Sequence, residues 1–417
     1  MTPRLPVPLL AAALALAGPG SGCSVETTYQ DVYPILQARC NSCHVDGIST
    51  YRPYFTDYDT VSSLERILRD AVTSREMPPF GMDDSTLCGN NYFADEGMWL
   101  GDVELKTITD WVDDGVPKGD VSDLMTGPAV PGYVEPELDH VDRTIDTGDA
   151  YAFSGFDPDT QHRCFIADPA LDDPVFLSGF QVRPGNKFSV QSLALYALDD
   201  PDTQAAAGAL VGKDGAPGYP CFGGAKIDGA RFLGTWVWGR NVVRFPQGTG
   251  IRLAPGTKLV VQIHYNPQGG SLHPGDDLTQ VDLELVDDAT EATYRALSAD
   301  GFSLRPGVAD AVARGYLEVK EPFTILAVAP LMHQSGETLE VDRVRPFSDT
   351  CLAQVQHWEF ESHLRLFQYL TPPPQVFPGD RLEITCGFQT QSRIEPTRQG
   401  EDASSEQCLA RLYTVPM

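Results

Sequence analysis

The chain has 417 residues, of which 42% are hydrophobic, and its 58 acidic and 30 basic residues give a formal net charge of −28. The length allows two or three domains with separate cores, and the hydrophobic content excludes wholesale disorder. A surface this acidic repels phosphate backbones and anionic lipids, so nucleic-acid binding is not expected.

The first 22 residues have the composition of an export signal. Arg4 precedes an apolar run at 9–17, and small residues then lead to Cys23. The run is too short to predict a membrane-spanning helix. We therefore expect an exported protein of the bacterial periplasm or outer membrane, a lipoprotein held to the membrane only through lipid on Cys23. Plain secretion is the alternative.

Residues 40–44 read Cys-Asn-Ser-Cys-His, the attachment pattern of a c-type haem. Cys40 and Cys43 can each form a thioether with a porphyrin vinyl group, which leaves His44 as the proximal iron ligand. A thioredoxin-like thiol pair or half of a zinc site would be the alternative. However, no second Cys/His pair follows at zinc-ligand spacing. The cofactor that we expect is haem c.

Two amphipathic helices are predicted around this motif. Val32, Ile35 and Leu36 recur at helical spacing before it, and the range 103–112 repeats the pattern, with Gly115 as the helix stop.

A methionine between these helices is the candidate for the second axial ligand. Met77 is followed by two prolines, which restrict the backbone and fix where the sulfur points. Histidine–methionine ligation suits electron transfer. Met82 and Met98 are the rival ligands.

The haem motif, Met77-Pro78-Pro79 and the range 108–115 resemble the class I cytochrome c domains of bacterial exported proteins. The resemblance implies a small all-α domain at 24–120 that carries single electrons and meets a redox partner protein. Residues 121–150 are rich in Pro, Gly and Asp and are predicted to be a linker.

The pattern changes to strands from Tyr151 onward. Three Pro-Gly turns each lead into a run with alternating apolar residues, which is typical of half-buried strands. These runs are 188–196, 259–265 and 382–388. We predict two antiparallel, jelly-roll-like β-sandwich domains at 151–285 and 286–417.

This region resembles the two domains of the copper type II ascorbate-dependent monooxygenases, the family of peptidylglycine and dopamine hydroxylases. The likeness is carried by the ranges 181–186, 220–223, 245–250, 261–267, 329–336, 358–360, 379–380 and 406–408. Bacterial chains with a cytochrome c domain ahead of this pair are a familiar arrangement.

The resemblance implies three copper-binding histidines in the first domain. Their adjacent His-His pair falls on Gln191 and Ser192, so only His264 remains. In the second domain the implied His-x-His pair leaves only His333, and the implied methionine is Gln407. One imidazole per site binds copper weakly, so copper is doubtful.

Other donors are poor substitutes. Gln191, Gln262, Gln407 and Met332 are the unorthodox ones, and Met332 should face away from its strand neighbour His333. The remaining histidines fit no metal spacing and are expected at the surface or in packing. They are His140, His162, His273, His357 and His363.

Six cysteines remain after lipid and haem are assigned, an even number that predicts disulfides in an oxidising compartment. Fifteen pairings are possible. The monooxygenase resemblance implies Cys164–Cys221 and Cys386–Cys408. Cys88 and Cys351 either join the cytochrome domain to the second sandwich or stay as thiols.

The sequence favours an exported haem electron carrier whose sandwiches are a binding or docking scaffold that no longer hydroxylates. The alternative is an active copper monooxygenase that receives electrons from its own cytochrome domain, so enzymatic activity stays open. A third possibility is a peptide or small ligand bound between the sandwiches, with the haem sensing redox state. A serine hydrolase and a dinucleotide enzyme are disfavoured, because their motifs are absent from the sequence.

Overall fold

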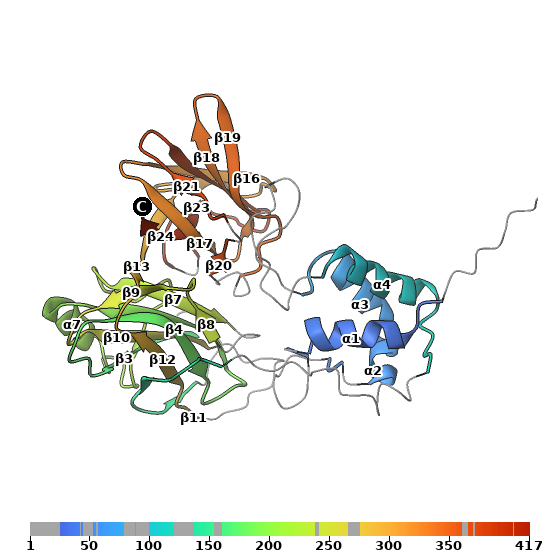
Figure 1. The fold of residues 1–417 in the computed structure, drawn as a ribbon, viewed down its shortest axis with the longest axis horizontal. Coiled ribbons are helices and arrows are strands. Elements are labelled where there is room, and N and C mark those ends of the chain that lie inside the picture. Colours follow the sequence, from blue (N-terminus) through green and yellow to red (C-terminus); the bar gives the residue numbers. More distant parts are fainter. Residues whose placement is uncertain are drawn as a thin grey trace, which may run out of the picture.

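The computed structural model describes residues 26–41, 43–44, 53–55, 57–78, 88, 100–120, 137–153, 161–237, 242–265, 276–360, 366–369, 372–402 and 404–417. The N-terminal part is helical, and the rest is mainly sheet, with the short helix α7 (Pro201–Gly208) beside the first sandwich (Figure 1). The export signal, Cys23, Met82, Met98, His273 and His363 lie outside the described residues. Within the described part, no helix is both long enough and apolar enough to span a bilayer.

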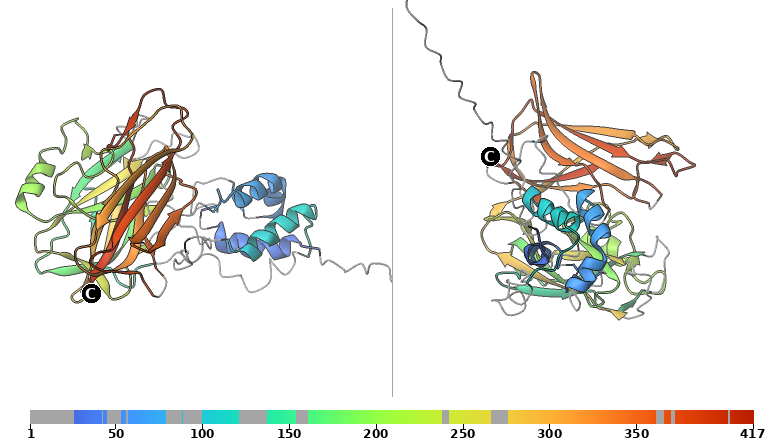
Figure 2. Two further views of the ribbon diagram at one scale, coloured as in Figure 1. Left: turned by 90° about the horizontal axis from the view of Figure 1, so that it is seen from above. Right: turned by 90° about the vertical axis from the view of Figure 1, so that its right-hand side faces the viewer.

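The helical part lies to one side of the sheets (Figure 1; Figure 2, left). Its helices are α1 (Tyr29–Arg39), α2 (Tyr58–Ser63), α3 (Glu65–Thr73) and α4 (Asp102–Asp113). Val32 and Leu36, one turn apart on α1, share a fully buried core with Ile108 and Trp111 of α4. The periodicity therefore predicted both helices correctly. Gly115 has φ +83° directly after α4, a left-handed conformation that ends a helix and favours glycine.

The helical part is closed by contacts between its two ends. The backbone N–H of Tyr29 donates to the Pro117 carbonyl at 2.9 Å, and the indole Nε1 of Trp111 donates to the same oxygen at 3.0 Å. Arg39 of α1 pairs with Glu104 of α4 at 3.0 Å. These contacts hold the start and the end of residues 26–120 together around one small core.

The first sandwich has two large sheets. One is six-stranded in the order β1-β12-β4-β9-β13 with β8 paired to β4, the other is five-stranded in the order β6-β3-β10-β5-β7, and β11 pairs with β2. The elements are β1 (Arg143–Asp146), β2 (Tyr151–Ala152), β3 (His162–Ala167), β4 (Val175–Arg183), β5 (Val190–Leu198), α7 (Pro201–Gly208), β6 (Tyr219–Pro220), β7 (Arg231–Val237), β8 (Val242–Arg244), β9 (Thr249–Leu253), β10 (Lys258–Tyr265), β11 (Asp276–Asp277), β12 (Gln280–Val286) and β13 (Thr290–Glu291).

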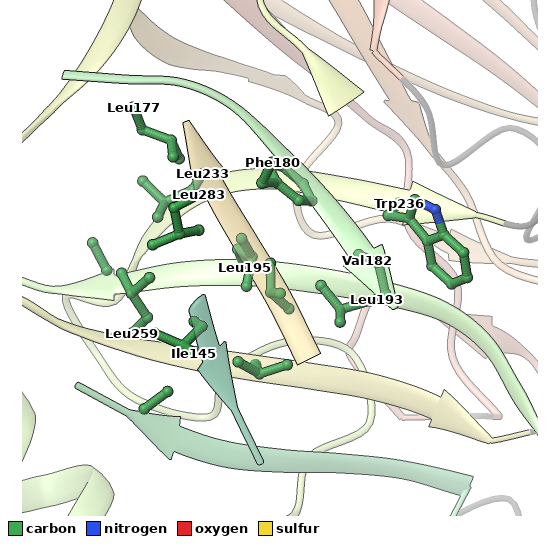
Figure 3. Close-up of a cluster of buried hydrophobic side chains, with 14 of the residues drawn as sticks. Ile145, Leu177, Phe180, Val182, Leu193, Leu195, Leu233, Trp236, Leu259 and Leu283 are labelled. Carbon is green, nitrogen blue, oxygen red and sulfur yellow. The ribbon is translucent and has the colours of Figure 1, made fainter. Parts of the chain in front are cut away.

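The core of this sandwich lies between its two large sheets (Figure 3). Leu177 and Phe180 of β4 belong to one sheet, and Leu193 and Leu195 of β5 belong to the other. All four side chains are at most 2% exposed. Burying each such side chain contributes about 1.5–3 kcal/mol, so this layer is the main stabilising feature of the domain.

The second sandwich pairs a five-stranded sheet with a four-stranded one. The orders are β14-β24-β17-β20, with β21 on β17, and β16-β22-β18-β19, and β15 pairs with β23. The strands are β14 (Thr293–Ser298), β15 (Ser303–Leu304), β16 (Ala311–Glu318), β17 (Phe323–Leu331), β18 (Gly336–Arg345), β19 (Ser348–Val355), β20 (Phe367–Gln368), β21 (Gln375–Val376), β22 (Arg381–Phe388), β23 (Thr397–Arg398) and β24 (Leu409–Pro416). Leu382, Ile384, Cys386 and Phe388 alternate into its core, as their period of two predicts.

The three strands predicted after Pro-Gly turns are β5, β10 and β22, with starts shifted by one or two residues. The predicted linker is wrong at its end. Ile145 of β1 lies opposite Val281 of β12, so the first sandwich begins before residue 151. β13 pairs with β9 and extends the same sheet beyond residue 285. A four-residue strand with one apolar side chain has no readable period, and only its pairing with β12 buries Ile145.

Three disulfides are present among the described residues. Cys164 bonds to Cys221 and Cys386 bonds to Cys408, the pairs that the resemblance implies. Cys88 bonds to Cys351 of β19, which settles the alternative that the sequence left open. Cys88 is buried in the core of the second sandwich, so this bond ties the N-terminal part to that domain.

The two sandwiches also contact each other directly. Tyr413 of β24 stacks on Phe245 of the first sandwich with ring centroids 5.2 Å apart, and its hydroxyl lies 3.1 Å from Thr249 Oγ1. Lys226 pairs with Glu401 across the same boundary at 3.0 Å. The second sandwich (orange to red) lies across the first (green to yellow) in Figures 1 and 2.

Candidate functional site

The Cys-x-x-Cys-His segment forms a tight turn at the end of α1. Cys40 is the C-cap of this helix, and the backbone N–H groups of Cys43 and His44 both donate to its carbonyl, at 3.0 and 2.9 Å. Neither cysteine belongs to any of the three disulfides. The turn therefore gathers both thiols and the imidazole at one helix end.

The His44 ring is oriented by a backbone carbonyl. Its Nδ1 lies 2.8 Å from the oxygen of Pro53, an acceptor, so Nδ1 carries the proton and Nε2 keeps its lone pair. A carbonyl acceptor on one ring nitrogen is the contact that commonly orients a metal-binding histidine. Burial raises the pKa of the Cys40 thiol to about 12. The thiols of redox-active Cys-x-x-Cys pairs have lowered pKa values, so the thioredoxin-like alternative gains no support.

Met77, the predicted axial ligand, lies after α3 and is 37% exposed. Its backbone N–H donates to the Ala71 carbonyl at 2.9 Å. Burial raises the pKa of Glu359 in the second sandwich, and the negative charge of Glu76 raises it further. The segment that carries Met77 therefore lies near the loop of Trp358 and Glu359.

A cavity of about 70 Å³ lies between the two sandwiches. Its walls include His162 and His264 of the first sandwich and His333 of the second. The ring of Phe222 contacts two of them edge-on, with its centroid 4.6 Å from that of His162 and 5.4 Å from that of His333. The three histidines are 9%, 7% and 3% exposed, respectively.

His264 is placed by the middle of three adjacent strands. On β10 it lies directly opposite His162 of β3 on one side and Ser192 of β5 on the other. The imidazoles of His162 and His264 stack with centroids 4.1 Å apart and an angle of 9° between their planes. The register of β10 shifts between His264 and Tyr265, which is the mark of a bulge.

His333 lies two residues after the end of β17 and is held by hydrogen bonds to both its backbone and its ring. Its backbone N–H donates to the buried carboxylate of Glu406 at 2.9 Å, and its carbonyl accepts from the indole of Trp358 at 3.0 Å. Its ring Nδ1 donates to the Ser405 carbonyl at 3.0 Å, which leaves the lone pair on Nε2. The backbone and the ring are thus fixed together.

The wall of the cavity carries a positive charge, the guanidinium of Arg411. The guanidinium of Arg411 lies 4.2 Å from the centre of the Phe232 ring, and burial lowers its pKa. Burial also lowers the pKa of His162 well below its usual range, and the neighbouring His264 and His333 lower it further. His162 is therefore a neutral imidazole at neutral pH.

Two of the unorthodox donors considered from the sequence, Gln262 and Met332, have structural roles. The side-chain amide of Gln262 donates to the Cys221 carbonyl at 2.6 Å and accepts from the Tyr196 hydroxyl at 3.3 Å. Met332 is fully buried in the core of the second sandwich and, as predicted, does not line the cavity beside His333.

The residues at the implied copper positions do not fit two sites with three donors each. Ser192 lies beside His264 where the resemblance implies an imidazole, and Leu331 lies before His333. Gln407 takes the place of the implied thioether. Each set therefore offers one strong donor for copper where three are required.

His162 was missed as a site residue by the sequence, which assigned it no metal role. The signal lies in strand register, because only the pairing of β3 with β10 brings it against His264. Arg411 was missed because its strand, β24, begins beyond the last matched motif, so no motif marked it. His140 and His357, by contrast, lie at the surface or near it, as expected.

Comparison with known proteins finds a matching family model and several relatives, two of which are described below. Residues 308–415 match the copper type II ascorbate-dependent monooxygenase, C-terminal domain. Tyramine beta-hydroxylase of Caenorhabditis briggsae is 25% identical over 201 residues, which are 44% of this chain and 34% of that protein. DBH-like monooxygenase protein 1 of Gallus gallus is 27% identical over 125 residues, which are 27% of this chain and 20% of that protein.

The chain thus spans about a third of the first relative and a fifth of the second. Among solved structures, naturally occurring empty particles of cowpea mosaic virus are 9% identical over 70% of this chain and 94% of that chain, with a TM-score of 0.29. A score this low carries no argument about fold. The two-sandwich module is therefore similar in sequence to the copper type II ascorbate-dependent monooxygenases, and its second sandwich matches their C-terminal domain.

Proposed function

We propose that this chain is an exported c-type haem protein that carries single electrons, joined to a monooxygenase-like module that lacks the two copper sites of its relatives. The observation that carries the haem assignment is the orientation of His44. His44 directly follows Cys43 in the turn after α1. Its Nδ1 donates a hydrogen bond to the Pro53 carbonyl, so Nε2 is the ligating nitrogen. Met77 is the proposed second protein ligand, and histidine–methionine ligation would suit a one-electron carrier.

The helical part is built to hold a small cofactor near the other domains. It closes on its own core through Pro117, and the Cys88–Cys351 bond tethers it to the second sandwich. Bound haem would supply one-electron chemistry, while the chain supplies the thiols, the oriented imidazole and the tether. The Met77 segment lies near the loop of Trp358, whose indole donates a hydrogen bond to the His333 carbonyl.

In this proposal the sandwiches are a docking or binding module and do not hydroxylate. Each implied copper set has one imidazole, which is too few donors to tune an oxygen-activating ion. The net charge of −28 suits a basic redox partner protein. Three disulfides are typical of an oxidising compartment, in keeping with export and lipidation at Cys23.

The haem proposal is tested by a haem count on the full chain produced in a bacterium that attaches c-type haem. We expect one haem that stays on the polypeptide after denaturation and is lost in Cys40→Ser, Cys43→Ser double variants. Met77→Leu should keep the haem but lower its reduction potential, whereas the control Met332→Leu should leave the potential unchanged. Absence of covalent haem would overturn the proposal.

A copper-dependent monooxygenase that draws electrons from its own haem is the second candidate. The observation in its favour is the group of three buried histidines between the sandwiches. Oxygen consumption that requires both copper and a reductant would replace the docking role with this activity.

A further inference from the structure

We propose that His162, His264 and His333 form a single transition-metal site between the two sandwiches, with copper preferred over zinc. The site differs from both copper sites that the resemblance implies. It takes one ligand from each of those sets and adds His162, which belongs to neither. It does not depend on the haem.

The position of His162 compensates for the donor missing at Ser192. Both residues flank His264, on β3 and β5 respectively, because β10 runs between these two strands. The imidazole absent from one side of His264 is therefore present on the other. This explains how a metal can bind here although the adjacent histidine pair is missing.

His162 is also buried like a metal ligand, and one of its ring nitrogens makes no hydrogen bond to the described residues. Its side chain is 91% buried, and its Nδ1 has no hydrogen-bond partner among the described residues. Buried polar atoms are nearly always satisfied, so such an atom beside a cavity indicates a group that another species completes.

His333 is prepared for the same role from the opposite domain. The Ser405 carbonyl fixes its tautomer and leaves Nε2 to ligate, while Glu406 and Trp358 fix its backbone. Carbonyl-oriented imidazoles of this kind are the usual form of metal-bound histidine. A shared ion would thus join two domains that are already in contact.

The surroundings select the type of ion. Among the described residues, the cavity lining contains no Asp or Glu, so the hard cations magnesium, calcium and manganese have no suitable donors there. Imidazole suits copper and zinc, and copper is bound more tightly by the same donors. Arg411 in the wall opposes a high local positive charge, which favours Cu(I) over divalent ions.

The three imidazoles line one cavity, but their ring nitrogens do not all lie close enough together to hold one ion. Among the described residues, the one group of three His, Cys, Asp or Glu donors within 4.8 Å of one another is Glu340, Asp342 and Cys351, and the sulfur of Cys351 is in a disulfide. Binding must therefore turn the stacked rings or draw the sandwiches together. The register shift after His264 allows such a turn, since bulges re-aim side chains.

The test is metal titration of the full chain with its haem attached, using Cu(I), Zn²⁺ and Mg²⁺. We expect one equivalent of copper, weaker zinc binding and no magnesium binding. His162→Phe, His264→Phe and His333→Phe should each weaken copper binding at least about tenfold, by comparison with the cost of losing even an outer-shell partner. His357→Phe, which changes an exposed histidine outside the cavity, is the matched control and should bind as the parent does.

Hydrogen exchange on the parent protein supplies a readout that needs no variant. Copper should protect the segments around His162, His264 and His333 together. Protection in one sandwich alone would overturn the proposal, as would two equivalents unaffected by His162→Phe or the absence of stoichiometric copper. A chain without covalent haem that still binds one copper would refute the haem proposal and leave this one standing.

Discussion

The imidazoles of His162 and His264 stack face to face with ring centroids 4.1 Å apart, although 101 residues separate them in the chain. Their strands pair so that the two residues are directly opposite. Burial, and then the neighbouring His264 and His333, lower the pKa of His162, so a proton on this ring is disfavoured.

We predict that His162 makes the fold sensitive to acid. Its folded pKa lies well below the unfolded value of about 6.5, so below that pH the unfolded chain binds a proton that the folded chain does not. Stability should fall as the pH drops, and His162→Phe should remove up to about 1.4 kcal/mol per pH unit of this slope. Urea unfolding between pH 7.5 and 5 measures it.

His140 provides the contrast for that experiment. A hydrogen bond with the Leu285 carbonyl raises its pKa, so the stability it contributes is present below the unfolded pKa and is lost as the pH rises. His140→Gln should therefore change the slope in the opposite sense. Parallel pH profiles for His162→Phe and the parent would contradict the prediction.

Asp342 is predicted to destabilise the second sandwich at neutral pH. Burial and the charges of Glu340, Asp349 and Glu383 raise its pKa to about 6. The folded state is then favoured below the unfolded pKa of about 3.9, and this benefit is lost as the pH rises through 6. Asp342→Asn should stabilise the protein by about 1–2 kcal/mol at pH 7.5, less than the full shift implies because solvent screens the cluster.

The measurement for Asp342→Asn is the urea midpoint at pH 7.5 and at pH 4. The gain should be absent at the lower pH, where the native aspartate is also protonated. Glu318→Gln, on strand β16 of the same sheet but separated from β18 by β22, is the control, because Glu318 is not among the charges acting on Asp342; it should change stability by less than about 0.5 kcal/mol. An equal gain at both pH values would exclude the electrostatic cause.

The ion pair of Arg163 and Asp214 is predicted to be essential to the first sandwich. The Arg163 side chain is 2% exposed, and its two terminal nitrogens bond to the Asp214 carboxylate at 2.8 and 2.9 Å. Asp214→Asn leaves a buried guanidinium without its anion. We expect a loss of about 2–3 kcal/mol, below the usual 3–5 because Asp214 is partly exposed.

Thermal unfolding of Asp214→Asn, followed by circular dichroism, checks this loss. Asp168→Asn serves as the control, since its pair with Lys258 is exposed and 4.0 Å long, and it should cost less than about 0.5 kcal/mol. Equal melting temperatures for the two variants would show that the buried pair contributes little.

Glu406 is predicted to hold the loop of His333. Its fully buried carboxylate accepts from the backbone N–H groups of His333 and Ser335, at 2.9 and 2.6 Å. Glu406→Gln places an amide donor where only donors face it, so we expect a loss of about 1–3 kcal/mol.

Urea unfolding and hydrogen exchange of residues 331–336 measure this effect. Glu337→Gln is the matched control, because its side chain makes an exposed hydrogen bond with Gln389 at 2.8 Å. It should be close to neutral. Unchanged exchange at 331–336 in Glu406→Gln would separate the loop from this carboxylate.

Local patterns were sufficient for much of the fold. The helices at 29–39 and 102–113 and the strands after the Pro-Gly turns were predicted because their apolar residues recur at 3.6 or two residues. The short strands β1 and β13 escaped prediction, because two to four residues carry no period and their pairing partners are remote in sequence.

By itself, the sequence determined the Cys-x-x-Cys-His motif and the residues that stand at the implied copper positions, because these depend on which residues stand at short, fixed spacings. Only the tertiary structure decided that Cys88 bonds to Cys351 and that His162 meets His264 and His333 in one cavity. The physical reason is that strand register and domain packing arise from the whole core. Side chains far apart in the chain are therefore brought together by contacts that neither residue specifies.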